Sequence, residues 1–319
     1  MNSTAAEPFH PRRIVIGANA HEEIAAALRG ARPELEVRGN RYLELTDADL
    51  AWADSYVGFK RPPVATMGGV RWVHCTGAGV DGWLFPDPLP VEILFTRTGE
   101  SFGPMIAEWA LARMLAFAQQ LSDLERCQRA ARWAPRDVMM LRGTRAVIVG
   151  TGDVGSHVAR LLIALGVELC GVSRSGRGDP ALFVRTVTSD RLADVVTDAR
   201  WLVVTVPLTD ATRGLVGREV LSACRGAVLL NAGRGAVVDE SLLPEALDAG
   251  WLSGAALDVF DVEPLPVDAP LWGDQRVMIS PHISGLTTVD GAIAGVLDTL
   301  AELEAGERPS RLVDRERQY

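Results

Sequence analysis

Lysine is nearly absent from this chain. Of the 32 lysine and arginine residues, only Lys60 is a lysine, and it lies in the loop-like stretch FKRPP. Chemistry that needs a lysine Schiff base is therefore nearly excluded. The chain has four cysteines, widely spaced and without paired Cys/His ligands nearby, so we expect no zinc site or other metal and interpret them as reduced, mostly buried thiols. They are Cys75, Cys127, Cys170 and Cys224.

Long apolar runs and basic stripes are also missing. No apolar run reaches the roughly 18 residues that a membrane span needs, and the start, MNSTAAEPFHPRR, lacks the pattern of a secretory signal. The net charge is −9, and no stretch is basic enough to follow a nucleic-acid backbone. We therefore expect a cytoplasmic protein without a membrane or nucleic-acid partner. With 319 residues, 48% hydrophobic, the chain is long enough for two domains.

The first hundred residues alternate between short apolar runs and helical patterns. Residues 12–18 (RRIVIGA) predict a strand and residues 21–31 (HEEIAAALRGA) a helix. Residues 71–75 and 91–96 are further strand candidates bounded by glycine, proline and aspartate. Such alternation is typical of a parallel sheet built from βαβ units.

A second alternating unit follows the break at Trp133-Ala134-Pro135. Before it, residues 105 to about 132 predict one helix, long enough to cross between two domains. After it, a helix is expected at 154–166, and six strands are expected at 144–150, 167–173, 201–207, 226–233, 252–260 and 276–282. Residues 287–306 are again helical, and we expect this tail to return to the first domain.

The predicted fold class is therefore α/β, with two Rossmann-like, doubly wound parallel-sheet domains and a cleft between them. Residues 1–101 and 287–319 would form a discontinuous substrate domain. Residues 102–286 would form the dinucleotide-binding domain.

The glycines of GTGDVG indicate where a dinucleotide binds. Gly150, Gly152 and Gly155 form G-x-G-x-x-G between a predicted strand and a predicted helix. Gly150 allows the tight turn, Gly152 the approach of the pyrophosphate and Gly155 the helix–strand packing. Backbone N–H groups at the helix start, including Asp153 and Val154, would then receive the phosphates. The alternative is a glycine-rich turn without a ligand.

The end of the next strand bears on cofactor choice. NAD sites usually carry an acidic residue here to bind the ribose hydroxyls, but this chain has Ser173, Arg174 and Ser175. A small hydroxyl beside an arginine suits a 2′-phosphate, which guanidinium can bind. We therefore expect NADP(H) to be preferred, with NAD(H) possible. The alternative is a solvated loop in an NAD enzyme.

Three residues at the ends of probable strands suit the reduction of a 2-oxo acid. Arg234, between two glycines, can bind a carboxylate and the adjacent carbonyl oxygen. His282 can give the proton to the developing alkoxide, because histidine exchanges protons near neutral pH. Glu263 can stabilise the protonated imidazole. Taken singly, each could instead be a structural or solvated residue.

Seven motifs together resemble the D-isomer-specific 2-hydroxyacid dehydrogenase family. They are GAGVDGW, IAEWALARML, GTGDVG, VPLTDATRGLV, NAGRGAVVDE, ALDVFDVEP and SPHISG. The resemblance implies that Arg234 orients the substrate, that His282 is the acid/base and that Glu263 is its partner.

The same resemblance assigns further site residues. It implies that the loop from Gly77 through Ala78, Gly79 and Val80 offers backbone N–H groups to the substrate carboxylate. Asp258 would bond the nicotinamide carboxamide, while Pro207 and Ala232 would line the cofactor site. The segment around Trp133 would form the arm of a homodimer.

Departures from the family pattern bear on the predicted cofactor and substrate. Ser173-Arg174 resembles the family's NADP-using glyoxylate and hydroxypyruvate reductases, and Glu263 argues against its formate dehydrogenases. Thr205 and Trp109 stand where many members carry histidine or, for Trp109, tyrosine. We therefore expect NAD(P)H-dependent reduction of a small 2-oxo acid, of the glyoxylate or hydroxypyruvate type, to the D-2-hydroxy acid.

Three alternatives stay open at this stage. The chain could be a dehydrogenase of another D-2-hydroxy acid or of phosphite. It could also be a non-catalytic, NAD(P)-sensing co-regulator. A Rossmann methyltransferase is the third, and it would make the three strand-end residues coincidental.

Overall fold

The computed structural model describes residues 9–99 and 102–319. Its contacts divide the chain into two compact units, which we call the first unit (residues 1–100 and 287–319) and the second unit (residues 101–286). The described residues do not include residue 101, where we predicted the domain boundary. They also do not include residues 1–8, the start of the segment that we predicted not to be a secretory signal. No helix within the described ranges is long and apolar enough to cross a membrane.

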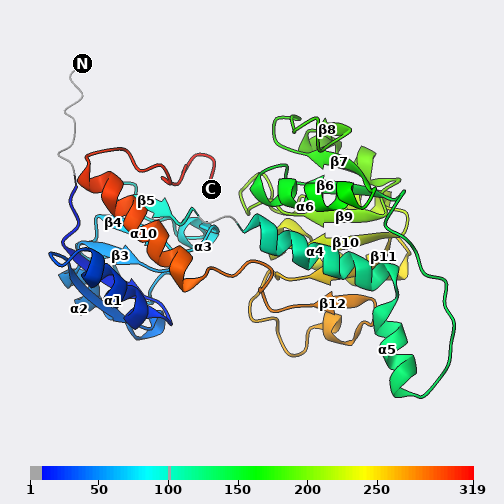
Figure 1. Cartoon of the computed structure of the whole chain (residues 1–319), viewed down its shortest axis with the longest axis horizontal. Helices are drawn as coiled ribbons and strands as arrows, with labels where there is room; N and C mark the ends of the chain where they lie inside the picture. The colour runs from blue at the N-terminus through cyan, green and yellow to red at the C-terminus, as the bar shows by residue number, and fades with distance from the viewer. Residues whose placement is uncertain (1–8, 100–101) are drawn as a thin grey trace. The chain divides into compact units, whose positions relative to one another are not determined.

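The first unit is built on a five-stranded sheet in the order β2-β1-β3-β4-β5, with every pair of strands parallel (Figure 1). Because all these strands run in the same direction, their carboxyl ends share one edge. The strands are β1 (Arg13–Gly17), β2 (Glu36–Asn40), β3 (Ser55–Val57), β4 (Trp72–Cys75) and β5 (Leu94–Arg97).

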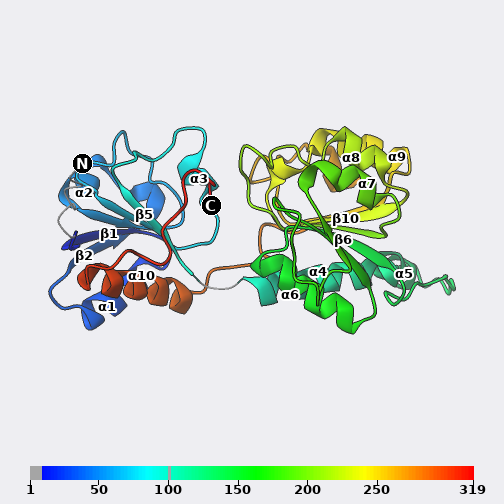
Figure 2. The same cartoon turned by 90° about the horizontal axis from the view of Figure 1, so that it is seen from above.

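Helices cover both faces of this sheet (Figure 2). Helices α1 (His21–Ala31) and α10 (Val289–Glu304) lie on one face, where α10 brings the end of the chain back to the first strands. The other face carries α2 (Asp47–Trp52) and α3 (Asp81–Leu84) over a core that includes Trp83 and Phe95.

The second unit has a seven-stranded parallel sheet in the order β12-β11-β10-β9-β6-β7-β8. Figure 1 shows these strands stacked from β8 to β12. The order reverses between β6 and β9, which is where ligands bind in open α/β sheets. The strands are β6 (Arg145–Val149), β7 (Glu168–Val172), β8 (Arg185–Val187), β9 (Trp201–Val204), β10 (Ala227–Asn231), β11 (Leu252–Leu257) and β12 (Val277–Ile279).

Both faces of this second sheet are buried because its strands are almost wholly apolar. In β6, Ala146 and Ile148 pack on one face, whereas Val147 and Val149 pack on the other. Helices α4 (Gly103–Ala118), α5 (Leu121–Arg129) and α6 (Asp153–Ala164) lie on the first face, and α7 (Leu192–Val196), α8 (Arg218–Ala223) and α9 (Leu243–Asp248) on the second (Figure 2). Short 3-10 turns occupy Tyr42–Glu44, Ser189–Arg191, Gly235–Val237, Glu240–Leu242 and Pro270–Gly273.

The expectation of two doubly wound parallel-sheet units is confirmed, but the single helix from 105 to about 132 is wrong. The chain forms α4 and α5 instead, separated at Gln120, whose φ of 53° is left-handed. Returning chain stabilises the break, since the amide of Gln119 donates to the carbonyl of Met139 (3.0 Å) and the Met139 N–H donates to Ala118 (2.9 Å). The short strands β2, β3 and β8 were not predicted.

His74 is a fully buried histidine in β4 of the first unit. Its ring nitrogens contact two threonine hydroxyls of the β5 end, Thr96 at 2.9 Å and Thr98 at 3.1 Å. Burial lowers the pKa of His74 from 6.5 to about 3, because the charged imidazolium loses its hydration. We therefore interpret the neutral His74 ring as a structural residue of the first unit.

Acid should destabilise the protein through His74. Between pH 6.5 and about 3 the unfolded chain binds a proton at this residue and the folded chain does not. The free energy of unfolding therefore decreases as the pH is lowered, by about 1.4 kcal/mol per pH unit in this range. The loss amounts to about 2 kcal/mol between pH 7 and pH 5. We would measure the free energy of unfolding in urea at pH 7 and at pH 5. We expect the difference between the two values to be smaller in His74→Gln than in the wild type by that amount. The exposed His10→Gln is the control, and equal pH dependence in both variants would contradict the assignment.

Candidate active site

The site residues predicted for the second unit all follow carboxyl ends of its strands. The glycine loop follows β6, Ser173 to Ser175 follow β7, Pro207 follows β9, Ala232 and Arg234 follow β10, Asp258 and Glu263 follow β11, and His282 follows β12. Parallel strands place these ends at one edge of the sheet. The structure therefore gathers residues that are up to 132 positions apart (282 − 150 = 132) at one edge.

The glycine loop has the geometry that close backbone packing requires. Gly150 has a φ of 106°, which only glycine adopts readily. A Cβ on Gly155 would lie 1.8 Å from the Gly150 carbonyl oxygen, so helix α6 contacts the loop directly. A Cβ on Gly152, by contrast, would meet no atom within 4 Å. Packing within the protein thus explains why residue 155 is a glycine. Gly152 instead leaves the start of α6 open to a ligand such as a pyrophosphate.

Ser173 closes a tight turn after β7. Its hydroxyl donates to the carbonyl of Arg177 (2.8 Å) and accepts from the Arg177 N–H (3.1 Å), and Gly176 takes a φ of 67°. Arg174, Ser175 and Arg177 are exposed on this turn. The Thr151 hydroxyl of the glycine loop also donates to the Arg177 carbonyl, at 3.4 Å. Two arginines therefore project from a turn joined to the glycine loop.

The loop that carries Arg234 is fixed by its backbone. The Asn231 side chain accepts from the Gly233 N–H (3.1 Å) and donates to the Arg234 carbonyl (3.0 Å). A Cβ on Gly235 would lie 1.9 Å from the carbonyl carbon of Phe260, so this loop presses on the segment that leads to Glu263. The arginine is thereby anchored beside the glutamate.

Glu263 and His282 form a direct pair. The Nδ1 of His282 lies 2.8 Å from Oε2 of Glu263, and the other oxygen of Glu263 accepts from the Phe260 N–H at 3.0 Å. The side chains are 34% and 36% exposed respectively, so a substrate can reach the imidazole while the carboxylate stays attached. With Nδ1 occupied, Nε2 is the nitrogen left for chemistry.

The charge state of Glu263 follows from its neighbours. Burial alone would raise the pKa of this carboxyl, but the hydrogen bonds from His282 and Phe260 and the charges of His282 and Arg234 outweigh burial and lower it below its usual value. Glu263 is therefore a carboxylate at neutral pH and stabilises positive charge on the imidazole.

Asp258 is a fully buried carboxylate next to this pair. One oxygen accepts from the Ser280 hydroxyl (2.6 Å) and the Ile283 N–H (3.0 Å), and the other accepts from the Ser284 N–H (2.8 Å). The Trp109 indole donates to the Ser280 oxygen at 3.0 Å. In this structure Asp258 holds the loop around His282; a bond to a carboxamide stays a prediction.

The predicted substrate loop follows β4 in the first unit. A Cβ on Gly77 would lie 2.6 Å from the ring of Phe59, which explains that glycine. Ala78 is exposed and Gly79 half-buried, and within the described ranges the N–H groups of Ala78 and Gly79 have no hydrogen-bond acceptor. Val80 is buried and precedes α3. Two N–H groups are thus available for an anion.

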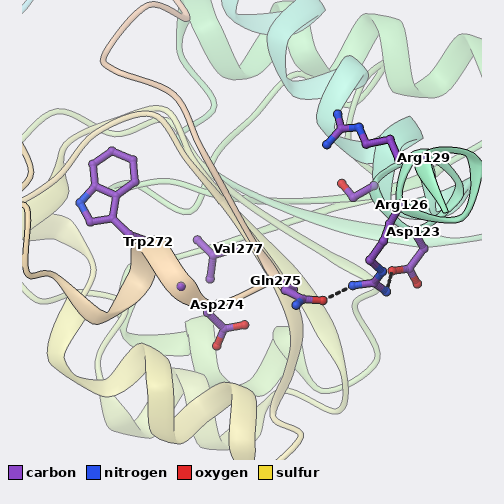
Figure 3. Close-up of a pocket in the computed structure, with 9 residues that line it drawn as sticks. Asp123, Arg126, Arg129, Trp272, Asp274, Gln275 and Val277 are labelled. Atoms are coloured by element: carbon purple, nitrogen blue, oxygen red, sulfur yellow. Dashed lines mark hydrogen bonds and ion pairs between the residues drawn. The ribbon is translucent and has the colours of Figure 1, made fainter.

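A hollow of about 410 Å³ in the second unit, drawn in Figure 3, is lined by none of these residues. It is bounded by α5, which contributes Arg126 and Arg129, and by the segment from Trp272 to Val277. Arg126 contacts Gln275 across it and Asp123 on its own helix. Among residues 9–99 and 102–319, no group of three His, Cys, Asp or Glu side chains is arranged to hold a metal ion.

Sequence reasoning missed three contributors to this edge. Arg177 follows the expected Ser-Arg-Ser by two residues, and a search for basic residues along the whole turn would have found it. Asn231 and Ser280 act through hydrogen bonds to loops, and no local pattern marks either.

Known proteins are similar to this chain in sequence. The family model described as "D-isomer specific 2-hydroxyacid dehydrogenase, NAD binding domain" matches residues 111–284. The chain is 34% identical to a glyoxylate/hydroxypyruvate reductase A of Salmonella paratyphi B, over 92% of this chain and 95% of that protein. It is 32% identical to the protein of that name from Enterobacter sp. strain 638, over 93% and 94%.

Solved structures agree with these sequence matches. A D-isomer specific 2-hydroxyacid dehydrogenase from Xanthobacter autotrophicus Py2, in complex with NADPH and MES, superposes with a TM-score of 0.83 at 30% identity, covering 97% of this chain and all of that one. An NADPH-dependent glyoxylate/hydroxypyruvate reductase from Sinorhizobium meliloti, in complex with NADP and sulfate, gives 0.82 at 27% identity over 97% and 100%. With the glycine loop and the arginine, glutamate and histidine at one sheet edge, these matches show that the chain belongs to the D-isomer specific 2-hydroxyacid dehydrogenase family.

Proposed function

We propose that this protein reduces a small 2-oxo acid, of the glyoxylate or hydroxypyruvate type, to the D-2-hydroxy acid with NADPH as the preferred hydride donor. The observation that carries the proposal is the 2.8 Å Glu263–His282 pair beside Arg234 at the sheet edge that also carries the glycine loop. The names of the similar reductases support the substrate class. The first unit would be the substrate domain and the second unit the dinucleotide-binding domain.

Each residue then has a chemical task. When bound, the nicotinamide supplies the hydride that adds to the carbonyl carbon. His282, protonated on both nitrogens, keeps Nδ1–H on Glu263 and gives the Nε2 proton to the carbonyl oxygen as it gains charge. The Glu263 carboxylate stabilises the imidazolium beforehand. Arg234 binds the carboxylate and carbonyl oxygens of the substrate. In the first unit, the N–H groups of Ala78, Gly79 and Val80 are proposed to bind an anion.

The nucleotide would lie along the carboxyl edge of the second unit. The pyrophosphate fits the N–H groups of α6, where Gly152, Asp153 and Val154 come first in the chain. Pro207 is exposed and follows β9, which borders the switch point. Ala232 is buried and follows the adjacent strand β10, and both positions suit residues that line such a site. Asp258 is proposed to orient the carboxamide.

Turnover tests the proposal directly. We expect purified protein to oxidise NADPH when offered glyoxylate or hydroxypyruvate, and we would compare pyruvate, phenylpyruvate and 2-oxoisocaproate. His282→Ala should lower kcat about a hundredfold or more, because the general acid is lost, while its NADPH affinity stays near that of the wild type. His10→Ala, an exposed histidine of the first unit, is the control.

Two outcomes would reject this function. Unchanged turnover in His282→Ala would remove the histidine from the chemistry. NADPH binding without oxidation of any of the five acids would favour a nucleotide-sensing protein or a different substrate.

The cofactor preference depends on the turn after β7. We propose that Arg174 binds the 2′-phosphate, with Arg177 as a second cation on the same turn. Arg174→Ala should raise the KM for NADPH at least tenfold and leave the KM for NADH nearly unchanged, since only NADPH carries the phosphate. Arg185→Ala, exposed on the neighbouring strand β8, is the matched control. Equal effects of Arg174→Ala on both cofactors would argue against this role.

We further propose a homodimer that uses the segment from Leu121 to Met140. Large apolar side chains exposed there include Trp133 (96%) and Met140 (66%), together with Leu121, Leu124 and Val138. Exposed apolar clusters of this kind mark protein contacts, and the hollow beside α5 borders the same segment (Figure 3). A second copy is the partner that the family implies.

A charge placed in this segment should separate the copies. We expect the double variant Trp133→Asp, Met140→Asp to run as a monomer in size-exclusion chromatography with light scattering, where the wild type runs as a dimer. Val267→Asp changes an equally exposed side chain (97%) elsewhere in the second unit and should stay dimeric. A wild-type monomer, or a dimeric double variant, would contradict the proposal.

A further inference from the structure

The backbone at His282 is strained. Its φ of 54° is left-handed, a conformation that residues with a Cβ adopt only at a cost in free energy. Such a residue stays in place when its surroundings over-determine it. The direction of the imidazole therefore depends on what holds the chain on either side of His282.

Asp258 supplies most of that restraint. Its backbone carbonyl accepts from the His282 N–H at 2.8 Å, and its carboxylate accepts from the N–H groups of Ile283 (3.0 Å) and Ser284 (2.8 Å). Three consecutive amides are thus bound by one residue that is itself 0% exposed. Any rotation of the carboxylate would shift the chain that carries the imidazole.

A buried hydrogen-bond relay fixes that carboxylate. The Ser280 hydroxyl donates to Oδ1 of Asp258 at 2.6 Å and accepts from Nε1 of Trp109 at 3.0 Å. An indole N–H can only donate, so Trp109 leaves the serine proton directed at Asp258. Each bond in such a chain polarises and strengthens the next.

Trp109 is a rigid starting point for the relay. It lies on α4, is 8% exposed and packs in the same core as Ala146 and Ile148 of strand β6. The relay therefore ties the loop after β12 to a helix that is packed against strand β6 inside the sheet. Nothing else in the chemistry proposed above uses this indole.

We infer that Trp109 is a positioning residue for His282, acting through Ser280 and Asp258. The inference rests on the proposed function, in which His282 is the proton donor. Loss of the indole donor frees the serine hydroxyl to turn, loosens the carboxylate and lets the strained segment relax. The imidazole is then misplaced in a fraction of molecules, so turnover falls while nucleotide binding at the glycine loop persists.

Matched variants separate positioning from packing. Trp109→Phe keeps a buried ring and removes the N–H, whereas Ser280→Ala removes the hydroxyl and Ser280→Thr restores it. The control is Trp201→Phe, because Trp201 is a buried tryptophan of the same core whose N–H donates to the Thr144 hydroxyl at 3.0 Å. Its loss costs a similar bond without touching the His282 loop.

The expected result is a split between kcat and binding. Trp109→Phe and Ser280→Ala should each lower kcat about tenfold, the scale of one lost buried hydrogen bond, with the Kd for NADPH within about twofold. The double variant should be no slower than either single variant, because one relay is broken in each. Ser280→Thr and Trp201→Phe should keep near-wild-type kcat. A Trp109→Phe rate equal to that of Trp201→Phe, or additive losses in the double variant, would overturn the inference.

A second readout keeps the test independent of turnover. Hydrogen exchange at the Ile283 and Ser284 amides should become faster in Trp109→Phe and Ser280→Ala but not in Trp201→Phe. Unchanged exchange would overturn the relay even if kcat fell. Faster exchange in a protein that reduces no 2-oxo acid would uphold the relay and reject the proposed function. If Trp109→Phe fails to fold, the Ser280→Ala and Ser280→Thr pair carries the same comparison.

Discussion

At the carboxyl edge of the seven-stranded sheet, backbone segments approach so closely that no Cβ fits between them. The helix start at Gly155 contacts the Gly150 carbonyl, Gly233 contacts the backbone of Val206, and Gly235 contacts Phe260. The second and third contacts join the loops after β9, β10 and β11, and the Thr205 hydroxyl, which donates to the carbonyls of Val149 and Gly150, joins the loop after β6 to them. The charged side chains of the site stand on these loops, so their distances are set by backbone packing and not by their own flexible stems.

Close packing also bears on the charge of Glu263. Glu263 is half removed from water, which disfavours its ionised form, yet it remains ionised because the imidazole, a backbone amide and Arg234 surround it. The carboxylate binds the imidazole at Nδ1, so Nε2 of the part-exposed His282 is left for a substrate. Asp258 differs from Glu263: it is wholly buried and accepts hydrogen bonds from the Ser280 hydroxyl and two backbone amides. Asp258 and Glu263 both follow strand β11 within six residues, but their roles differ. Glu263 stabilises charge on the imidazole, whereas Asp258 holds the loop around His282 in place.

The sequence was sufficient to predict features that depend on local patterns. Fully apolar runs such as 146–149 and 201–204 predicted the buried strands, and the glycine spacing predicted the loop after β6. Family motifs predicted which side chains reach the edge, including the Glu263–His282 pair that the structure joins. The boundary between α4 and α5 could not be predicted, because it is stabilised by Met139, which returns from twenty residues away. The same holds for Ser280 and Trp109, whose hydrogen bond spans 171 residues and leaves no trace in local periodicity.

The left-handed backbone at His282 has a consequence for how this protein would respond to selection. Glycine adopts a φ of 54° without the steric penalty, of about 1 kcal/mol, that a Cβ brings. Folding alone therefore favours glycine at this position, and retention of histidine opposes the local preference of the chain. A library screened only for resistance to heat would be drawn toward glycine here. Improvement of stability and retention of an imidazole are consequently competing objectives at position 282, and any evolution experiment would have to select for both at once.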